Sequence, residues 1–221
     1  MEDSSATFTL MELFRMGGII MWPLLLFSIA TVAITLERTI FLIYHNLKID
    51  DLKEKVAAAI LKGNPDEARE FLESHTRRRM GARVFLALVN HHRSSGSRLS
   101  ERRLEKAVET EAARSIASLE SGFSLLTTLA SLSPLTGFLG TVTGMIAAFR
   151  SIAEAADVNA QIVAGGIYEA LITTVFGLVI AIVAMSAHSI FINIVDKFTA
   201  ELELACSDLI IGICEAAKNE D

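Results

Sequence analysis

The sequence has few cysteines and no recognisable catalytic motif. Its two cysteines, Cys206 and Cys214, have a spacing that suits neither a zinc site nor a redox pair, so we expect reduced thiols in a helix. No pattern for nucleophilic, metal or nucleotide chemistry is present, and no cofactor is expected. The formal net charge of -6 is modest, and nucleic acid is not expected as a partner. The sequence therefore gives no support for an enzyme.

Charge is missing altogether from three long parts of the chain. Residues 17–36, 121–149 and 170–187 contain no Asp, Glu, Lys or Arg. Each run is roughly 18 residues or longer, which is enough for a helix to cross the ~30 Å hydrocarbon layer of a membrane. Buried helices of soluble proteins are also apolar, but a chain of 221 residues has too little left to cover three of them. We therefore predict an all-α membrane protein with three transmembrane helices.

Lysine and arginine are concentrated between the first and second runs. Of the 20 such residues, fifteen lie from Lys48 to Arg114, whereas the link after the second run has only Arg150 and the N-terminal tail only Arg15. Cytoplasmic segments of membrane proteins are enriched in these residues. We therefore expect a periplasmic N-terminus and a cytoplasmic C-terminus. The acidic start of the chain at Glu2 does not resemble a cleaved signal peptide, so we expect the first span to be retained.

The long connection has the pattern of short helices. Apolar spacing predicts one helix over Asp50–Leu61 and another over residues 81–91. Between them, Asn64 is expected to cap a helix that starts at Pro65, with Glu67 completing a capping box. Residues 94–97, which are serines and a glycine, form the one clear break.

The second and third spans are expected to continue beyond the membrane. From residue 100 the pattern predicts one uninterrupted helix into the second span, roughly 50 residues or ~75 Å long. The third span likewise runs past Asp196 into an amphipathic tail. We therefore expect two of the three transmembrane helices to extend far into the cytoplasm as a helical bundle. The predicted segments are a periplasmic tail (1–16), transmembrane helix 1 (17–43), a cytoplasmic helical domain running into helix 2 (44–120), transmembrane helix 2 (121–150), a short periplasmic loop (151–161), transmembrane helix 3 (162–194) and a cytoplasmic helical tail (195–221).

Small residues recur at helical spacing in the second and third spans. Small residues let membrane helices approach closely, so this pattern predicts tight packing between the two spans. Pro134, near the middle of the second span, frees a backbone carbonyl and predicts a kink. The glycines assigned to this packing are Gly137, Gly140, Gly144, Gly166 and Gly177.

A single acid, Glu169, interrupts the apolar sequence of the third span. From residue 162 to residue 194, the only other Asp, Glu, Lys, Arg or His residue is His188. A carboxylate in a membrane helix costs at least several kcal/mol unless it faces protein or water, or is protonated. Thr173 lies one turn further on the same face, and Thr174 about 100° around the helix. These residues predict a site that binds and releases a proton or cation, in an ion-conducting or ion-coupled protein.

Two segments of the sequence resemble the signatures of a known family. Residues 134–145, PLTGFLGTVTGM, are similar to the second-span signature of the MotA/TolQ/ExbB proton-channel family. Residues 165–174, GGIYEALITT, followed by Gly177 and Leu178, are similar to its third-span signature. Glu37 and Arg38, at the end of the first span, fit the same pattern. The resemblance covers essentially the whole chain in the number and order of its spans.

The resemblance implies an inner-membrane pentamer of the ExbB/TolQ type that encloses the single spans of an ExbD- or TolR-like partner. Proton motive force would rotate the ring relative to that core and energise a TonB- or TolA-like transducer of a TonB or Tol-Pal system. Glu169 would be the pore glutamate, and Thr141 and Thr174 the two pore threonines. The partner would supply an aspartate in its own span, and membrane lipids would surround the ring. The coupling ion is H+, with Na+ as the alternative.

One departure from the family pattern and several alternatives bear on this hypothesis. The family often has a proline further along the third span, but residues 181–184 have none and Val183 stands in that place. ExbB-like and TolQ-like roles are not separated by the sequence. A flagellar-stator role is less expected, since such proteins typically have four spans. A different class of function is a structural membrane scaffold in which Glu169 contacts a partner span.

Overall fold

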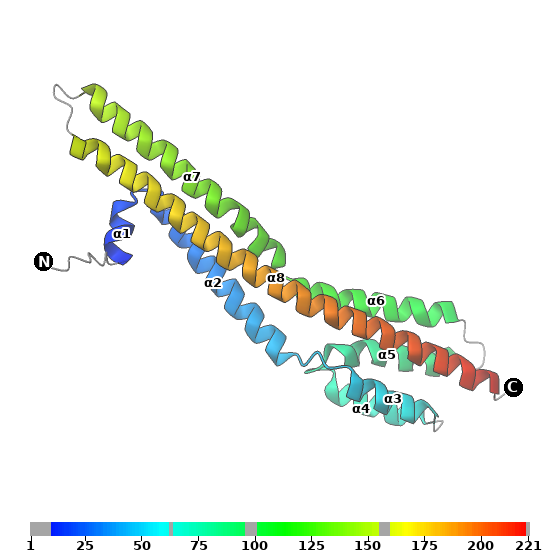
Figure 1. The fold of residues 1–221 in the computed structure, drawn as a ribbon. Helices are drawn as coiled ribbons and strands as arrows, with labels where there is room; N and C mark the ends of the chain where they lie inside the picture. The colour runs from blue at the N-terminus through cyan, green and yellow to red at the C-terminus, as the bar shows by residue number, and fades with distance from the viewer. Residues whose placement is uncertain (1–9, 62–63, 96–100, 155–159, 220–221) are drawn as a thin grey trace, which may run out of the picture. The chain divides into compact units, whose positions relative to one another are not determined.

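The computed structural model describes residues 10–61, 64–95, 101–154 and 160–219. All regular structure in these ranges is helical (Figure 1). Three stretches within them are long and apolar enough to cross a membrane, namely Met21–Tyr44, Arg102–Glu154 and Ala164–Cys214. The predicted all-α membrane fold with three spanning helices is thereby confirmed. In chain order the helices are α1 (Leu10–Met16), α2 (Met21–Tyr44), α3 (Asp50–Leu61), α4 (Pro65–His75), α5 (Met80–Ser95), α6 (Glu101–Glu120), α7 (Phe123–Glu154) and α8 (Ala160–Asn219).

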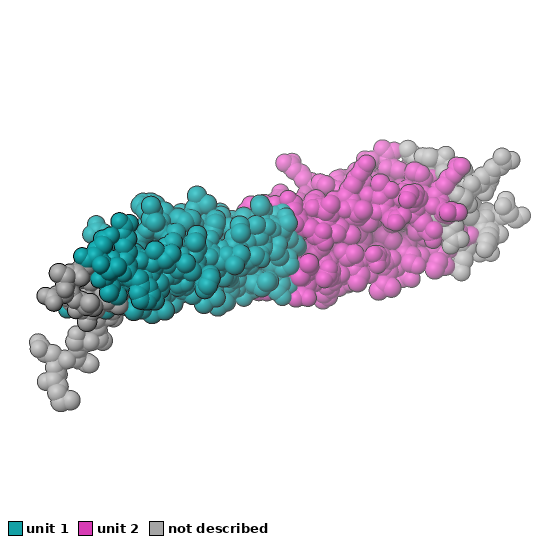
Figure 2. Space-filling model, turned by 90° about the horizontal axis from the view of Figure 1, so that it is seen from above, with its two compact units in different colours: residues 1–36, 122–189 teal, residues 37–121, 190–221 magenta. Residues whose placement is uncertain are grey.

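The helices form two compact units (Figure 2). Unit 1 comprises Met1–Leu36 and Gly122–Ser189, and unit 2 comprises Glu37–Ser121 and Ile190–Asp221. The boundary falls inside α2 and inside α8, so both helices contribute residues to each unit. The uncharged stretches of the sequence belong almost entirely to unit 1, and the connection rich in lysine and arginine belongs to unit 2.

In unit 1, α8 packs against both of the other long helices. Met21 and Leu24 of α2 form a buried cluster with Ile172 and Ile180 of α8. On another face, α8 packs against α7, whose buried residues recur every three or four positions, as expected for one face of a helix. These α7 residues are Phe123, Leu126, Ala130, Ser133, Gly137, Gly140, Gly144 and Ala148. The helix that carries Glu169 is therefore the central helix of unit 1.

Unit 2 is a helical bundle with a core of large apolar side chains. Phe85 and Leu88 of α5 are fully buried, as are Leu52 of α3, Leu72 of α4 and Leu202 of α8. Charged side chains of this unit form ion pairs, such as the pair between Lys53 and Asp208 at 2.5 Å. Burial of large apolar side chains is the main source of stability for a helical bundle in water.

The predicted uninterrupted helix into the second span is wrong at one point. α6 ends at Glu120 and α7 begins at Phe123, with a turn between them. Gly122 has a φ of 84°, a conformation that glycine adopts without the steric cost of a side chain. The backbone requirement at Gly122, not a loss of apolar pattern, therefore separates the two helices.

The short helices of the connection are close to their predicted positions. The helix over Asp50–Leu61 is confirmed with those bounds, and the one predicted over residues 81–91 is longer, as Met80–Ser95. α5 thus continues into the predicted break, whose last two residues lie outside the described ranges. The predicted capping box is wrong, because Asn64 makes no side-chain cap hydrogen bond. Its side-chain amide instead donates to the Glu67 carboxylate at 3.4 Å.

Candidate functional site

Backbone atoms and small residues form the contact between α7 and α8. A Cβ added to Gly177 would lie 2.5 Å from the carbonyl oxygen of Ser133 and 3.2 Å from the Cα of Gly137. A Cβ on Gly137 would lie 2.7 Å from the carbonyl oxygen of Thr173. Further along, Gly144 and Gly166 face each other, since a Cβ on either would lie 3.0 to 3.2 Å from the other's carbonyl oxygen. These glycines have no space for a side chain.

Two threonine hydroxyls of α8 share one carbonyl oxygen of α7. Thr173 is buried, and its hydroxyl donates to the carbonyl oxygens of Gly137 at 3.2 Å and Ala170 at 2.8 Å. The hydroxyl of Thr174 donates to the same Gly137 oxygen, also at 3.2 Å. Gly140 completes this contact, because a Cβ there would overlap the Thr173 side chain. The structure thus brings Thr173 and Thr174 together with the glycines of α7.

Thr141 makes its hydrogen bond within its own helix. Its hydroxyl donates to the carbonyl oxygen of Phe138 at 2.6 Å. Other hydroxyls of the helix do the same with carbonyls three or four residues before them, a common arrangement for serine and threonine in membrane helices. They belong to Thr127, Thr128, Ser131, Ser133, Thr136 and Thr143. α7 also continues through Pro134 without ending there, and the predicted kink stays a prediction.

The Glu169 side chain lies against the turn between α1 and α2. It is half-buried, and within the described part of the chain its carboxylate has no hydrogen bond or ion pair. A Cβ on Gly18 would overlap Oε1 of Glu169 and would lie 2.8 Å from its Cδ. Gly18 itself has a φ of 65°, so its backbone favours glycine. A carboxylate without a polar partner in an apolar unit is costly, so Glu169 remains the candidate functional residue.

The structure places Glu169 and Thr174 against different neighbours. Five residues separate them, which puts their side chains about 140° apart around α8 at 3.6 residues per turn. Thr174 contacts Gly137 of α7, whereas Glu169 contacts Gly18 in the turn before α2. Within the described ranges, no hydrogen bond joins Glu169 to Thr141, Thr173 or Thr174. The Glu169 carboxylate and the Thr174 hydroxyl therefore lie on different sides of α8, whereas Thr173 is only about 40° from Glu169 around the helix.

Sequence reasoning missed Gly18. Its role depends on a positive φ and on a contact with a residue about 150 positions later in the chain, as the Gly18–Glu169 contact shows. The only available signal is the pair of adjacent glycines, Gly17 and Gly18, directly before the first span. Such a pair indicates a turn but does not identify what the turn contacts.

Glu37 and Arg38, the third element of the resemblance, lie in unit 2. The Arg38 guanidinium donates to both carboxylate oxygens of Glu37, at 2.5 and 2.8 Å. It also donates to the carbonyl oxygen of Ser118 in α6 at 3.4 Å. Since a guanidinium has five donors in a fixed plane, it can make these contacts together. Arg38 thereby links the end of α2 to the end of α6.

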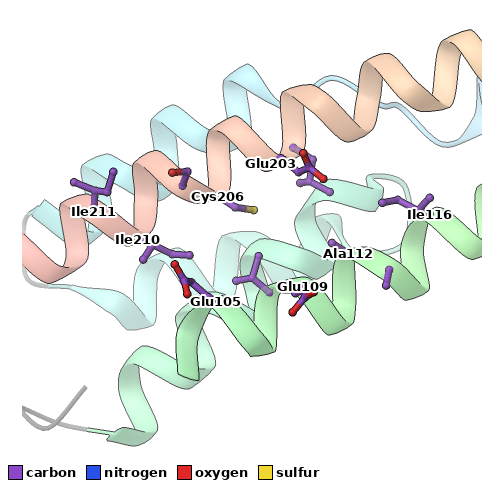
Figure 3. A pocket seen from close by; sticks show the side chains of 12 residues that line it. Glu105, Glu109, Ala112, Ile116, Glu203, Cys206, Ile210 and Ile211 are labelled. Carbon is purple, nitrogen blue, oxygen red and sulfur yellow. The ribbon is translucent and has the colours of Figure 1, made fainter. Parts of the chain in front are cut away.

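Unit 2 also contains an apolar groove that includes none of the predicted site residues (Figure 3). The groove lies between α6 and α8 and has a volume of about 400 Å³, with Glu105, Glu109 and Glu203 among its lining residues. Cys206 lies in it, in a part of α8 that carries charged residues and follows the apolar stretch. Burial, and secondarily the charge of Glu203, raises the pKa of Cys206 to about 12. A protonated thiol is a poor nucleophile and metal ligand, so Cys206 is not expected to react readily.

The described ranges contain no group of three or more His, Cys, Asp or Glu side chains arranged to hold a metal ion. The candidate site is one carboxylate in the apolar part of α8, with the Thr174 hydroxyl directed to α7.

Comparison with known proteins identifies the family. The sequence model of the MotA/TolQ/ExbB proton channel family matches residues 76–204. A biopolymer transport protein, ExbB-like 1, of Synechocystis sp. is 33% identical over 209 residues, which cover 88% of this chain and 78% of that protein. The biopolymer transport protein ExbB of Xanthomonas campestris is 28% identical over 85% of this chain and 79% of its own length. The Tol-Pal system protein TolQ of Haemophilus influenzae is 46% identical over 34% of this chain and 33% of its own length. The match to the family model covers more than half of the chain and includes α7 and the part of α8 with Glu169. The chain therefore belongs to the MotA/TolQ/ExbB proton channel family.

Proposed function

We propose that the chain is the ring-forming inner-membrane subunit of a motor driven by proton motive force. With an ExbD- or TolR-like single-span partner, it would transfer energy to a TonB- or Tol-Pal-type system. The observation that carries this proposal is the Glu169 carboxylate in the apolar part of α8, which has no polar partner among the residues that the structure describes. Membership of a proton channel family and the relatives named ExbB and TolQ support it.

In this function Glu169 takes up and releases the transported ion. Moving one elementary charge across the membrane supplies about 2.3 kcal/mol per 100 mV, so heavy mechanical work needs several protons per stroke. The Thr141 and Thr174 hydroxyl oxygens would line the path on the other side of α8, where a partner aspartate would exchange the proton. Carboxylates and hydroxyls also bind Na+, which is the alternative coupling ion.

An oligomeric ring is supported by the apolar surface that one chain leaves uncovered. On α7, the exposed apolar residues include Leu135, Phe138, Ile146 and Phe149. α8 has a comparable exposed face, which includes Leu171, Val175 and Ile182. Membrane helices cover such faces with lipid or with other helices. We propose that copies of the chain, in a pentamer, cover part of them and lipids the rest.

The protein lies in the inner membrane, as its three apolar helices and its ExbB and TolQ relatives support. We propose that its N-terminus is periplasmic and its C-terminus cytoplasmic. The support is the distribution of positive charge, because fifteen of the 20 lysines and arginines lie between Lys48 and Arg114 in unit 2. In this orientation the start of α2 is its periplasmic end.

The direct test is ion flux. The protein would be co-expressed with an ExbD- or TolR-like single-span partner, reconstituted in liposomes, and assayed under an imposed membrane potential. We expect partner-dependent proton flux in the wild type and none in Glu169→Gln. Glu73→Gln is the matched control, because it neutralises an exposed acid in α4 that only pairs with Arg69 on the surface.

Equal flux in wild type and Glu169→Gln would contradict the motor function and would favour the structural scaffold. A flux that follows a Na+ gradient instead of a proton gradient would change the coupling ion and leave the role of Glu169 in place. Copurification of the partner with each variant shows whether loss of flux reflects loss of assembly.

A further inference from the structure

We propose that Gly18 is a positioning residue for Glu169, and that the turn at residues 17–20 forms the outer end of the ion path. The inference rests on the proposed function and adds to it the place at which the ion reaches Glu169. Neither Gly18 nor the turn is part of the two sequence signatures that led to Glu169.

The geometry at Gly18 leaves room for the Glu169 carboxylate and for nothing more. A Cβ at this position would overlap Oε1 and lie 2.8 Å from Cδ and 3.6 Å from Cγ of Glu169. Two independent features of Gly18 are therefore needed for the contact. One is the absence of a side chain, and the other is the φ of 65° that directs the backbone through the turn.

The turn is held in place against α8 by apolar contacts on either side of it. Phe14 of α1 packs against the buried cluster that Met21 of α2 and Ile172 of α8 help to form. Phe14 also meets the edge of Trp22, with ring centroids 5.5 Å apart. Gly17 adjoins the same cluster, since a Cβ there would lie 3.5 Å from Cγ2 of Ile172. The contact between Gly18 and Glu169 is thus part of a packed corner of unit 1.

This corner sets the side of α8 from which Glu169 exchanges its proton. The turn precedes α2, so in the proposed orientation it lies at the periplasmic end of that helix. Thr174 faces α7, about 140° away around α8 and five residues further along it. The Glu169 carboxylate therefore accepts a proton from water beside the turn and releases it, after rotation of its side chain, on the side of Thr174 and the partner. One proton is taken up and one is released, and no covalent bond to carbon changes.

The main test compares substitutions of two glycines in different surroundings. Gly18→Ala adds a methyl group against the carboxylate, and Gly18→Asn adds a Cβ in a residue type that tolerates positive φ. Gly212→Ala is the control, because nothing lies within 4 Å of a Cβ at that position in α8 and it lies outside both signatures. Partner-dependent flux in liposomes is expected to fall at least about tenfold in both Gly18 variants, since misplacing a reacting group by about 1 Å can cost up to about a hundredfold. Gly212→Ala is expected to stay within about twofold of the wild type, since its methyl group has open space.

A double variant separates positioning from a loss of structure. Glu169→Asp shortens the acid by one methylene group and withdraws it from the turn, so a methyl group at residue 18 has less to displace. We expect flux in the Gly18→Ala, Glu169→Asp pair to equal that of Glu169→Asp alone, which is the non-additivity expected of residues in contact. A variant that was merely unfolded would lose flux in both backgrounds.

The outcomes separate this inference from the proposed function. Wild-type flux in Gly18→Ala or Gly18→Asn, with none in Glu169→Gln, would overturn the role of Gly18 and keep the motor. Independent, multiplicative losses in the double variant would also overturn it. Flux that survives Glu169→Gln would instead contradict the proposed function itself.

Discussion

The α7–α8 contact in unit 1 is made by backbone and small residues, whereas the core of unit 2 is made by large apolar side chains. In unit 1 the closest approaches involve Gly137, Gly177 and the carbonyl of Ser133. In unit 2 the core consists of fully buried residues such as Phe85 and Leu202. The difference follows from the surroundings. Lipid is as apolar as leucine, so large side chains gain little by packing in a membrane, and close backbone approach stabilises the contact instead. In water, burial of apolar surface supplies the free energy.

The comparison predicts that unit 2 is most sensitive to the removal of atoms. Phe85→Ala removes a fully buried ring from α5 and leaves a cavity in the bundle. We expect a loss of about 3–5 kcal/mol in the free energy of unfolding, the usual cost of Phe→Ala in a core. The thermal midpoint of the protein in detergent, followed by circular dichroism, is the measurement. A loss below about 1 kcal/mol would show that side-chain burial does not hold unit 2 together.

Unit 1 should instead be most sensitive to the addition of atoms. Gly177→Ala places a methyl group 2.5 Å from the Ser133 carbonyl oxygen and forces α7 and α8 apart. The expected cost is about 1–3 kcal/mol, as for other overpacked positions. Gly212→Ala is the control in the same helix, because its Cβ would have open space. It should be neutral or stabilising by up to about 1 kcal/mol, since alanine is the better helix former. Equal midpoints for the two variants would contradict the backbone contact.

A smaller effect is expected from the hydroxyl groups of unit 1. Thr173→Val removes the hydrogen bonds to the Gly137 and Ala170 carbonyls while keeping the shape of the side chain. The expected loss is about 0.6 kcal/mol and at most about 1.7, the range measured for such bonds between membrane helices. Thr31→Val in α2 is the matched comparison, because the buried Thr31 hydroxyl has no acceptor in the described part of the chain. We expect Thr31→Val to be neutral or stabilising, and the opposite order of the two variants would count against the assigned bonds.

The smallest effect concerns reactivity and not stability. Cys206 is buried in the groove of unit 2, with a pKa raised to about 12 by burial, whereas Cys214 is half-buried. A raised pKa keeps the Cys206 thiol protonated up to high pH, and the thiolate is the form that reacts. Maleimide labelling followed by mass spectrometry should therefore modify Cys214 first at pH 8. Faster modification of Cys206 would show that the groove admits solvent more freely than its apolar lining indicates.

The sequence predicts the spans and the glycine packing well, because both depend on patterns along one helix. The uncharged stretches predict α2, α7 and the first part of α8, and small residues at helical spacing identify the α7–α8 contact. Two features that depend on backbone dihedrals are missed, namely the break at Gly122 and the turn at Gly18. The contact between Glu169 and the turn at Gly18 is missed for another reason. A residue at the edge of a helix face can contact either of two neighbouring elements. Tertiary packing decides which one it contacts, and the periodicity of the sequence does not show this.

The hydroxyl groups of α7 also have a consequence for the electrostatics of this helix. A serine or threonine hydroxyl has one hydrogen to donate and two lone pairs that accept. In α7 the hydrogens of Thr128, Ser131, Thr136 and Thr141 are already donated to carbonyl oxygens of the same helix. What these side chains still offer to their surroundings is oxygen lone pairs. Lone pairs of this kind interact more favourably with a cation than with an anion, so these hydroxyls give α7 a local preference for positive charge although it has no acid between Phe123 and Phe149.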